Sequence, residues 1–167
     1  MRSWLLIILA IATGGCAGYK LGPTNGIAAG SRTVKFKPFI NHTQEPRITE
    51  YFSTSLRKQL QQDGTFRLQT SGSPDILVTG EITQFDRAGL SYQANDVLTP
   101  QEYTLIMRAR VVAVDVNTGK TFINRTVQGS TYIRIGNDET SAERQAIPLL
   151  TDTLARSAIS LLVDGAW

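Results

Sequence analysis

The chain has 167 residues, of which 41% are hydrophobic and 19% charged, and its formal net charge is +3. This length supports one domain with a hydrophobic core, and the composition excludes an intrinsically disordered chain. A charge this small gives no support for binding to nucleic acid. One cysteine and one histidine exclude an internal disulfide and leave too few ligands for a His/Cys metal site, so we expect neither a metal nor a cofactor.

The first 15 residues have the layout of a bacterial export signal. A basic start containing Arg2 precedes an apolar run at residues 5–13, and two glycines then lead to Cys16. The apolar run is too short to span a bilayer as a stable helix. Small residues followed by a cysteine resemble the lipobox of bacterial lipoproteins, although Thr13 stands where leucine is usual.

The lipobox resemblance implies that residues 1–15 are a lipoprotein signal peptide and that Cys16, acylated on its thiol, begins the mature chain. Ala17 rather than aspartate follows, which by the sorting rule of Gram-negative lipoproteins implies the periplasmic face of the outer membrane. Residues 16–31 are rich in Gly, Ala, Pro and Asn, which predicts a flexible, lipid-anchored tether. The alternative is an ordinary N-terminal anchor with an incidental cysteine.

Residues 32–167 are predicted to form a single α/β sandwich domain. Residues 32–40 alternate between apolar and polar side chains, which predicts a strand that ends, or lies at a sheet edge, near Pro38. Pro46 then opens a helix that stops at Asp63-Gly64. Its apolar stripe consists of Ile48, Phe52, Leu56 and Leu60.

Four further strands are predicted in the middle of the chain. They are residues 66–70, 76–85, 103–116 and 120–135. Residues 86–99 are predicted to be a longer polar connection, and Asn117-Thr118-Gly119 a tight hairpin turn. In the strand at 103–116, alternate side chains are apolar and face the core, whereas Arg108 and Arg110 point away from it.

The last helix is predicted to start at a capping box, Thr140 to Glu143, with Pro148 marking a kink or a second start. The order β-α-β-β-β-β-α predicts an α+β fold, a two-layer sandwich with a mixed sheet of four to five strands and two helices on one face. The other sheet face is then polar and free. The side chains expected to be buried between helices and sheet are Phe52, Leu56, Leu154 and Leu161.

Residue patterns typical of catalysis are absent from the sequence. There is neither a Gly-rich phosphate loop nor a Gly-x-Ser-x-Gly elbow. His42 stands in a polar turn without a partner nucleophile nearby, and Glu81, Asp86 and Asp115 are spread along strand ends rather than paired. We therefore expect a protein that acts by binding and is not an enzyme.

Several segments together resemble the LPS-assembly lipoprotein family, LptE, which partners the LptD β-barrel in the outer membrane. They are residues 15–21 (GCAGYKL), 34–43, 56–66 (LRKQLQQDGTF), 80–83 (GEIT), 114–120 and 136–150 (GNDETSAERQAIPLL). Each motif is weak, and their order behind a lipobox carries the resemblance. It implies a lipoprotein that sits inside an LptD-like barrel, helps it assemble and contacts lipopolysaccharide, with the lipid anchor in the membrane and no nucleic acid bound.

A second hypothesis is a lipid-anchored periplasmic adaptor of another envelope complex with the same fold. It stays open because the strand-turn-helix from Phe36 to Leu60 also resembles the TolB N-terminal and CsgG types of envelope domain. A hydrolase is a distant third, disfavoured by the missing site.

The candidate binding site lies on the sheet face predicted to be free and on the adjoining connection from Arg87 to Tyr92. Lipopolysaccharide is polyanionic and amphipathic, so its binder needs cations beside a few apolar or aromatic contacts. The candidate residues for binding lipopolysaccharide or the partner are Arg87, Tyr92, Arg108, Arg110, Tyr132 and Arg134. The alternative is that these are ordinary solvated residues of a sheet.

Overall fold

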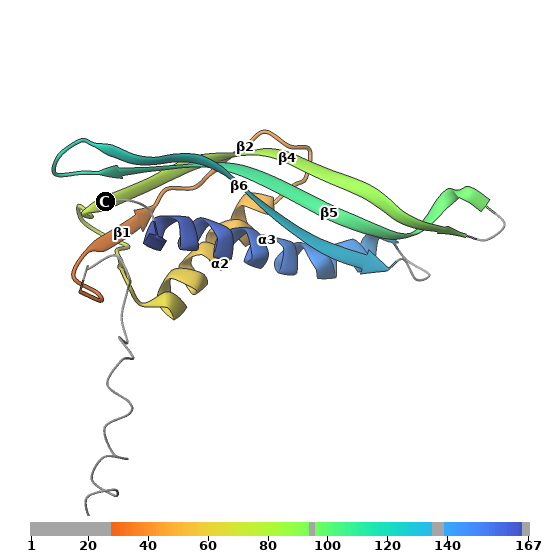
Figure 1. Ribbon diagram of the computed structural model, residues 1–167, viewed down its shortest axis with the longest axis horizontal. Coiled ribbons are helices and arrows are strands. Elements are labelled where there is room, and N and C mark those ends of the chain that lie inside the picture. Colours follow the sequence, from red (N-terminus) through yellow and green to blue (C-terminus); the bar gives the residue numbers. More distant parts are fainter. Residues whose placement is uncertain (1–27, 94–95, 135–138, 165–167) are drawn as a thin grey trace, which may run out of the picture.

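The computed structural model describes residues 28–93, 96–134 and 139–164, and shows a sheet lying on a layer of two helices (Figure 1). In chain order the elements are β1 (Thr33–Phe36), β2 (Ile40–Asn41), α2 (Ile48–Asp63), β3 (Arg67–Leu68), β4 (Ile76–Gln93), β5 (Asp96–Asp115), β6 (Thr121–Arg134) and α3 (Glu139–Asp164). The predicted signal peptide, Cys16 and most of the tether lie outside the described residues. Near the start of the described residues, the Gly30 N–H donates a hydrogen bond to the Thr65 carbonyl at 2.9 Å.

The sheet is mixed, with the strand order β3-β1-β4-β5-β6 and with β2 also paired to β4. Strand β1 pairs in parallel with β3 and with β4, and β2 also pairs in parallel with β4. The pairs β4–β5 and β5–β6 are antiparallel. The crossover from β1 to the parallel strand β3 contains β2 and helix α2, and a helix is the usual form of such a connection. The predicted α+β fold, with two helices on one face of a mixed sheet, is confirmed.

The first half of the chain departs from the predicted boundaries at two prolines. The strand predicted at 32–40 is divided into β1 and β2, with Pro38 between them, and both short strands pair with β4. Helix α2 begins at Ile48 rather than at Pro46, because Arg47 takes a left-handed conformation with φ of 60°. Both differences are local and leave the topology unchanged.

The polar connection predicted at residues 86–99 is wrong. Strands β4 and β5 run on through this segment, and their register continues to the pair Gln93 and Asp96. The last residue of β6, Arg134, lies opposite Glu102, so the remainder of β4 and β5 forms a two-stranded arm. Figure 1 shows this arm reaching past the end of α3, so that neither of the described helices lies against it. Without a described helix beneath it, the arm needs no apolar face, and its sequence has no apolar alternation that would predict strands.

Helix α3 differs from the prediction at its start. It begins at Glu139, so Thr140 lies within the first turn rather than at the N-cap, and Pro148 lies inside one helix that continues to Asp164. By length and hydropathy α3 is the one helix in the described ranges that could span a bilayer, but 56% of its apolar window is buried in the fold. We therefore interpret α3 as a core helix.

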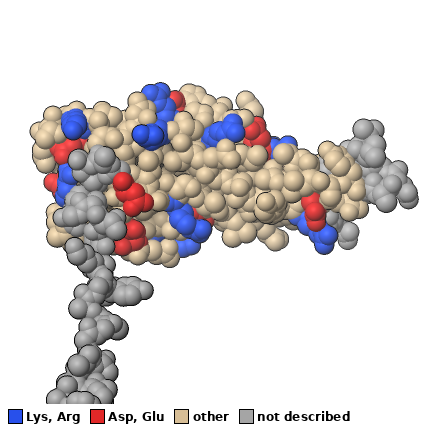
Figure 2. Space-filling view, in the orientation of Figure 1, with Lys and Arg blue, Asp and Glu red and all other residues tan. Residues whose placement is uncertain are grey.

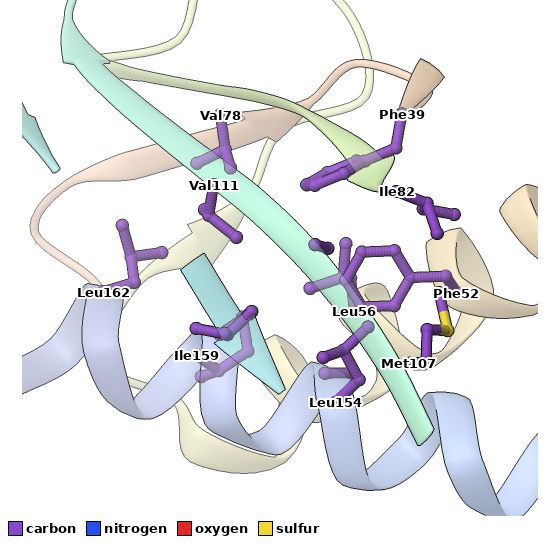
Figure 3. Packing of buried hydrophobic residues seen from close by; sticks show 14 of the residues in the cluster. Phe39, Phe52, Leu56, Val78, Ile82, Met107, Val111, Leu154, Ile159 and Leu162 are labelled. Carbon is purple, nitrogen blue, oxygen red and sulfur yellow. The ribbon is translucent and has the colours of Figure 1, made fainter. Parts of the chain in front are cut away.

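The hydrophobic core fills the space between the sheet and the two helices (Figure 3). Burial of Phe52, Leu56 and Leu154 is confirmed, since none of them is more than 1% exposed. Leu161 is only partly buried, and Leu162 is in the core instead. Because α3 packs on both the sheet and α2, its buried surface is wider than one stripe. The buried residues of α3 are Ala146, Ile147, Leu150, Thr151, Leu154, Ala155, Ala158, Ile159, Leu162 and Val163.

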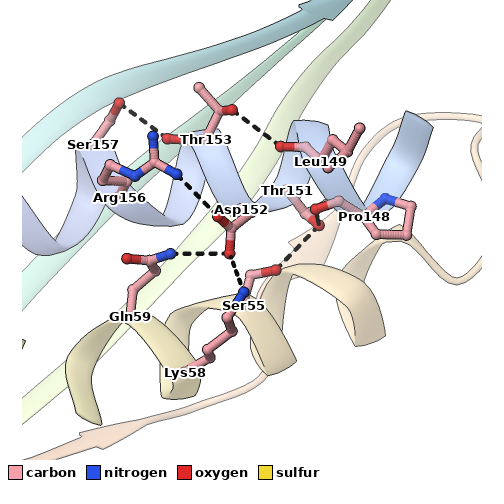
Figure 4. Close-up of polar contacts among 10 residues, drawn as sticks. All are labelled: Ser55, Lys58, Gln59, Pro148, Leu149, Thr151, Asp152, Thr153, Arg156 and Ser157. Atoms are coloured by element: carbon pink, nitrogen blue, oxygen red, sulfur yellow. Dashed lines mark hydrogen bonds and ion pairs between the residues drawn. The ribbon is translucent and has the colours of Figure 1, made fainter. Parts of the chain in front are cut away.

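A polar seam joins α2 to α3 (Figure 4). The hydroxyls of Ser55 and Thr151 are 3.2 Å apart in the interior, and the Asp152 carboxylate accepts hydrogen bonds from Gln59 at 2.9 Å and Lys58 at 3.2 Å. Burial of Asp152 tends to raise its pKa, but these hydrogen bonds outweigh that effect and hold the pKa below its usual value. The seam fixes the two helices side by side beneath the sheet.

Helix α3 packs closely against β6 at Gly129. A Cβ atom at this position would lie 2.7 Å from the backbone nitrogen of Leu154 and 2.9 Å from its Cα. These are backbone atoms, so a larger residue could be accommodated only by moving the helix away from the sheet. Glycine is therefore required here for packing.

We expect Gly129→Ala to lower the free energy of unfolding by about 1–3 kcal/mol, the usual cost of overpacking a core. Urea denaturation followed by circular dichroism would measure this loss. The control is Ser130→Ala, which changes an exposed neighbour and should alter stability by less than about 0.5 kcal/mol. Equal effects of the two variants would contradict the tight helix–sheet contact.

Candidate functional site

The face of the sheet opposite α2 and α3, here called the open face, carries Arg108 and Arg110 on its central antiparallel strand. Strand β5 lies between β4 and β6, and its core-facing residues alternate with these arginines. Figure 1 shows the two helices on the other side only. The open face is not uniformly polar, because Leu77, Val112 and Val114 lie half-buried on it.

Arg108 is held between two uncharged amides. Its Nε donates to Gln128 Oε1 on β6 at 2.8 Å, and one terminal nitrogen donates to Gln84 Oε1 on β4 at 2.6 Å. These hydrogen bonds fix the plane of the guanidinium across three strands. Because both partners are neutral, the positive charge is oriented without being neutralised by them.

Arg110 belongs to a chain of charged and polar groups. Its Nε donates to Asn124 Oδ1 at 2.8 Å, and another of its nitrogens lies 3.7 Å from Glu81 Oε1. The second oxygen of Glu81 is 3.0 Å from His42 Nε2. The contacts thus run from Arg110 through Glu81 to His42, and the charge of Arg110 is partly balanced by the Glu81 carboxylate.

Arg134 and Tyr132 lie farther along the same face. Arg134 Nε is 3.1 Å from Glu102 Oε1, and the Ser91 hydroxyl donates to the other oxygen of Glu102 at 3.1 Å. Tyr132 is 76% exposed. At about 3.4 Å per residue, Arg134 lies roughly 20 Å along β6 from Gln128, the residue opposite Arg108. The structure thus separates two central arginines from a distal Arg134–Tyr132 pair.

Arg87 is on the other side of the sheet. Thr83 is an extra residue in β4, because Ile82 pairs with Ala109 and Gln84 with the next residue, Arg108. This bulge exchanges the two faces for the residues that follow. The pattern of pairs therefore places Arg87 opposite Leu105, on the side covered by helices.

Arg87 forms a three-way ion pair on that side. Its terminal nitrogen is 3.1 Å from Glu45 Oε2 and 2.5 Å from Glu143 Oε1, and its guanidinium carbon lies 4.8 Å from the centre of the Phe85 ring. The arginine thus links β4 to the segment before α2 and to α3. Tyr92 is 49% exposed and pairs with Pro100 on the arm, beyond the end of β6.

Sequence reasoning missed the partners of the arginines and the bulge. Glutamine is common on the solvated face of a strand, so nothing in the sequence marks Gln84 and Gln128 as partners of Arg108. The bulge did leave a signal, since the core-facing apolar residues of β4 are two apart up to Ile82 and then three apart, at Phe85. In the view of Figure 2, basic side chains lie beside acidic ones and do not gather into a basic patch.

Comparison with known proteins identifies both a family and a fold. Residues 31–162 match the model of the family LptE, described as lipopolysaccharide-assembly. No curated protein sequence matches the chain. The match covers all the described strands and all but the last residues of α3.

Solved structures share the fold at low sequence identity. A hypothetical protein of Chlamydia trachomatis matches with TM-score 0.57 and 14% identity over 83% of this chain and 98% of that one. A protein of Xanthomonas campestris matches with TM-score 0.60 and 10% identity, over 87% and 91%. Uncharacterized lipoprotein B of Nitrosomonas europaea matches with TM-score 0.51 and 10% identity, over 87% and 88%. Identities this low establish a common fold.

The Arg87 ion pair gives a testable pH dependence. Burial and the nearby Glu143 carboxylate raise the pKa of Glu45, against the opposite effect of Arg87. A group whose pKa is raised on folding stabilises the fold below its ordinary pKa, and this contribution is lost as the pH rises through the folded-state pKa. The free energy of unfolding of Glu45→Gln, relative to that of the wild type, should therefore be higher in neutral buffer than in acidic buffer. Urea denaturation at the two pH values measures this difference.

Glu143→Gln removes one of the two causes and should lower the pKa of Glu45 toward its ordinary value, as followed by NMR titration of the Glu45 carboxyl carbon. Glu50→Gln, on the exposed side of α2, is the control and should leave the Glu45 titration unchanged. An unchanged titration in Glu143→Gln would contradict this arrangement of charges.

Proposed function

Because the chain belongs to the LptE family of lipopolysaccharide-assembly proteins, we propose that it is an outer-membrane lipoprotein that partners an LptD-like β-barrel translocon in lipopolysaccharide transport and outer-membrane assembly. The observation that carries the proposal is the family match over residues 31–162, nearly the whole folded domain. The signal-like residues 1–15, followed by Cys16, support export and lipid anchoring on the periplasmic face of the outer membrane.

The open face is the proposed binding surface. Arg108 is the strongest candidate, because its hydrogen-bond partners Gln84 and Gln128 orient the guanidinium but leave its charge available. An oriented guanidinium binds phosphate and carboxylate groups through paired N–H donors. Val112, on the same strand, offers the apolar contact that an amphipathic anion also needs. The site binds and positions its ligand and carries out no chemical step.

The other candidate residues have different roles in this proposal. Arg110 and Arg134 already face the carboxylates of Glu81 and Glu102, so an anionic ligand must compete with these pairs. Arg87 holds α3 to the sheet and lies outside the binding surface. Tyr92 and Tyr132 remain exposed aromatic contacts for lipid or for the barrel.

The lipid anchor is tested at Cys16. Cys16→Ala removes the only thiol of the chain, so the protein should lose acyl labelling and should leave the outer-membrane fraction. Metabolic labelling with a radioactive fatty acid and membrane fractionation measure the two effects. Labelling that persists in the variant would refute the anchor.

The binding surface is tested by charge reversal at Arg108. A hydrogen bond to a charged group contributes about 1.5–3 kcal/mol, so Arg108→Glu should weaken binding of purified lipopolysaccharide by about tenfold or more. Arg57→Glu is the matched control, because it makes the same charge change at an exposed position of α2 and should leave affinity within about twofold. Circular dichroism should show both variants folded. Equal affinities of Arg108→Glu and the wild type would place the site elsewhere.

A further inference from the structure

Strand β6 is a long edge of the sheet, and no other strand of the described residues pairs with its outer side. It ends the strand order β3-β1-β4-β5-β6 and is 14 residues long, whereas β3 at the opposite edge has only two residues. A strand at an edge presents a row of backbone N–H and C=O groups to a neighbouring chain, and proteins usually keep such edges short. The two edges are therefore unequal, and β6 is the one long enough to accept another strand.

Two side-chain contacts show which backbone groups of β6 point outward. Arg108 and Gln128 are directly opposite each other in β5 and β6. The Arg108 carbonyl accepts the Thr83 hydroxyl of β4 at 3.3 Å, and the Gln128 carbonyl accepts the Ser157 hydroxyl of α3 at 3.4 Å. The two carbonyls thus point away from each other, as in a pair without mutual hydrogen bonds.

The alternation of an antiparallel ladder extends this assignment along β6. Every second residue from Asn124 to Arg134 directs its N–H and C=O away from β5, and the residues between them bond to β5. Thr126 and Ser130 flank the one position, Gln128, that Ser157 covers. The outward amides on either side of Gln128 are the groups that an added strand would pair with.

A groove of about 660 Å³ runs between this edge and the C-terminal half of α3. Its lining combines apolar side chains with hydroxyl and charged groups, namely Phe122, Ile123, Arg125, Thr126, Val127, Ser157, Ser160, Leu161 and Asp164. Side chains of a strand alternate between two faces, so a strand added to β6 would place every second side chain toward this groove. Backbone pairing and a side-chain pocket therefore occur together.

We propose that the edge of β6 accepts an extended segment of the barrel partner as an additional strand, with a carboxylate of that segment against Arg125. This inference rests on the proposed function for the identity of the partner. Charge supports the choice of occupant: β6 contains Arg125 and Arg134 and no acidic residue, and Arg125 makes no ion pair within the described ranges. A second copy of β6 would add a strand that carries the same two positive charges and no carboxylate, whereas an acidic segment is complementary.

Proline at an outward position tests the inference. Thr126→Pro removes an N–H that does not bond to β5, so the variant should fold, but its ring should block an added strand. Thr126→Val is the matched control, because it keeps the N–H and the β-branched shape. In co-purification with the co-expressed LptD-like barrel, we expect Thr126→Pro to retain at least tenfold less barrel than Thr126→Val or the wild type.

Hydrogen exchange on the unmodified chain gives an independent measurement. Outward amides at Thr126, Ser130 and Tyr132 should exchange fast in the free protein and slowly in the barrel complex, whereas Val127 and Gly129 should be protected in both states. This measurement does not depend on whether the proline variant folds. Fast exchange at the three outward amides in the complex would overturn the inference.

The possible failures are distinguishable. If the wild-type chain retains no barrel, the proposed partnership and this inference both fail. If it retains the barrel and folded Thr126→Pro retains it equally, only the strand addition fails, and lipopolysaccharide binding at Arg108 is unaffected. A dimer of the purified chain that Thr126→Pro dissociates would assign the edge to a second copy and overturn the choice of the barrel segment.

Discussion

Close packing of α3 onto β6 is the constraint on which the rest of the molecule depends. At Gly129 the backbone of the strand and that of Leu154 come so near that no side chain fits between them. This contact holds α3 against the core side of the sheet. The hydrogen bond between the Ser55 and Thr151 hydroxyls in turn keeps α2 beside α3. Both amphipathic helices are thereby committed to one face. The other face has to meet solvent or a ligand, and its chemistry follows from that exposure.

Two arginines on the same face of β5 differ in their ability to attract an anion, because their hydrogen-bond partners differ. Arg108 is positioned by glutamines, and Arg110 faces the Glu81 carboxylate. An amide accepts a hydrogen bond without cancelling a charge, whereas a carboxylate does both. The identity of the supporting side chains, rather than the presence of arginine, therefore decides which cation can attract an anion.

The sequence predicted the fold best where burial is one-sided. Helix α2 shows its stripe from Ile48 to Leu60 and β5 its alternation because each has one apolar and one polar face. Neither described helix lies beneath the arm beyond Glu102, so no pattern marks it as strand. Leu161 was expected in the core in place of Leu162, since a helix buried against two neighbours has no single stripe. For the site, the sequence predicted which face carries Arg108 and Arg110 but not what holds them.

The bulge at Thr83 makes the length of β4 as important as its composition. One extra residue sets the register for everything toward the arm, so Gln84 lies on the open face and Phe85 and Arg87 on the helix side. Losing a single residue here would exchange these assignments without altering any other letter of the sequence. It would turn Phe85 out to solvent and break the link from Arg87 to Glu143. Along this strand, insertions and deletions of one residue are therefore more disruptive than most substitutions.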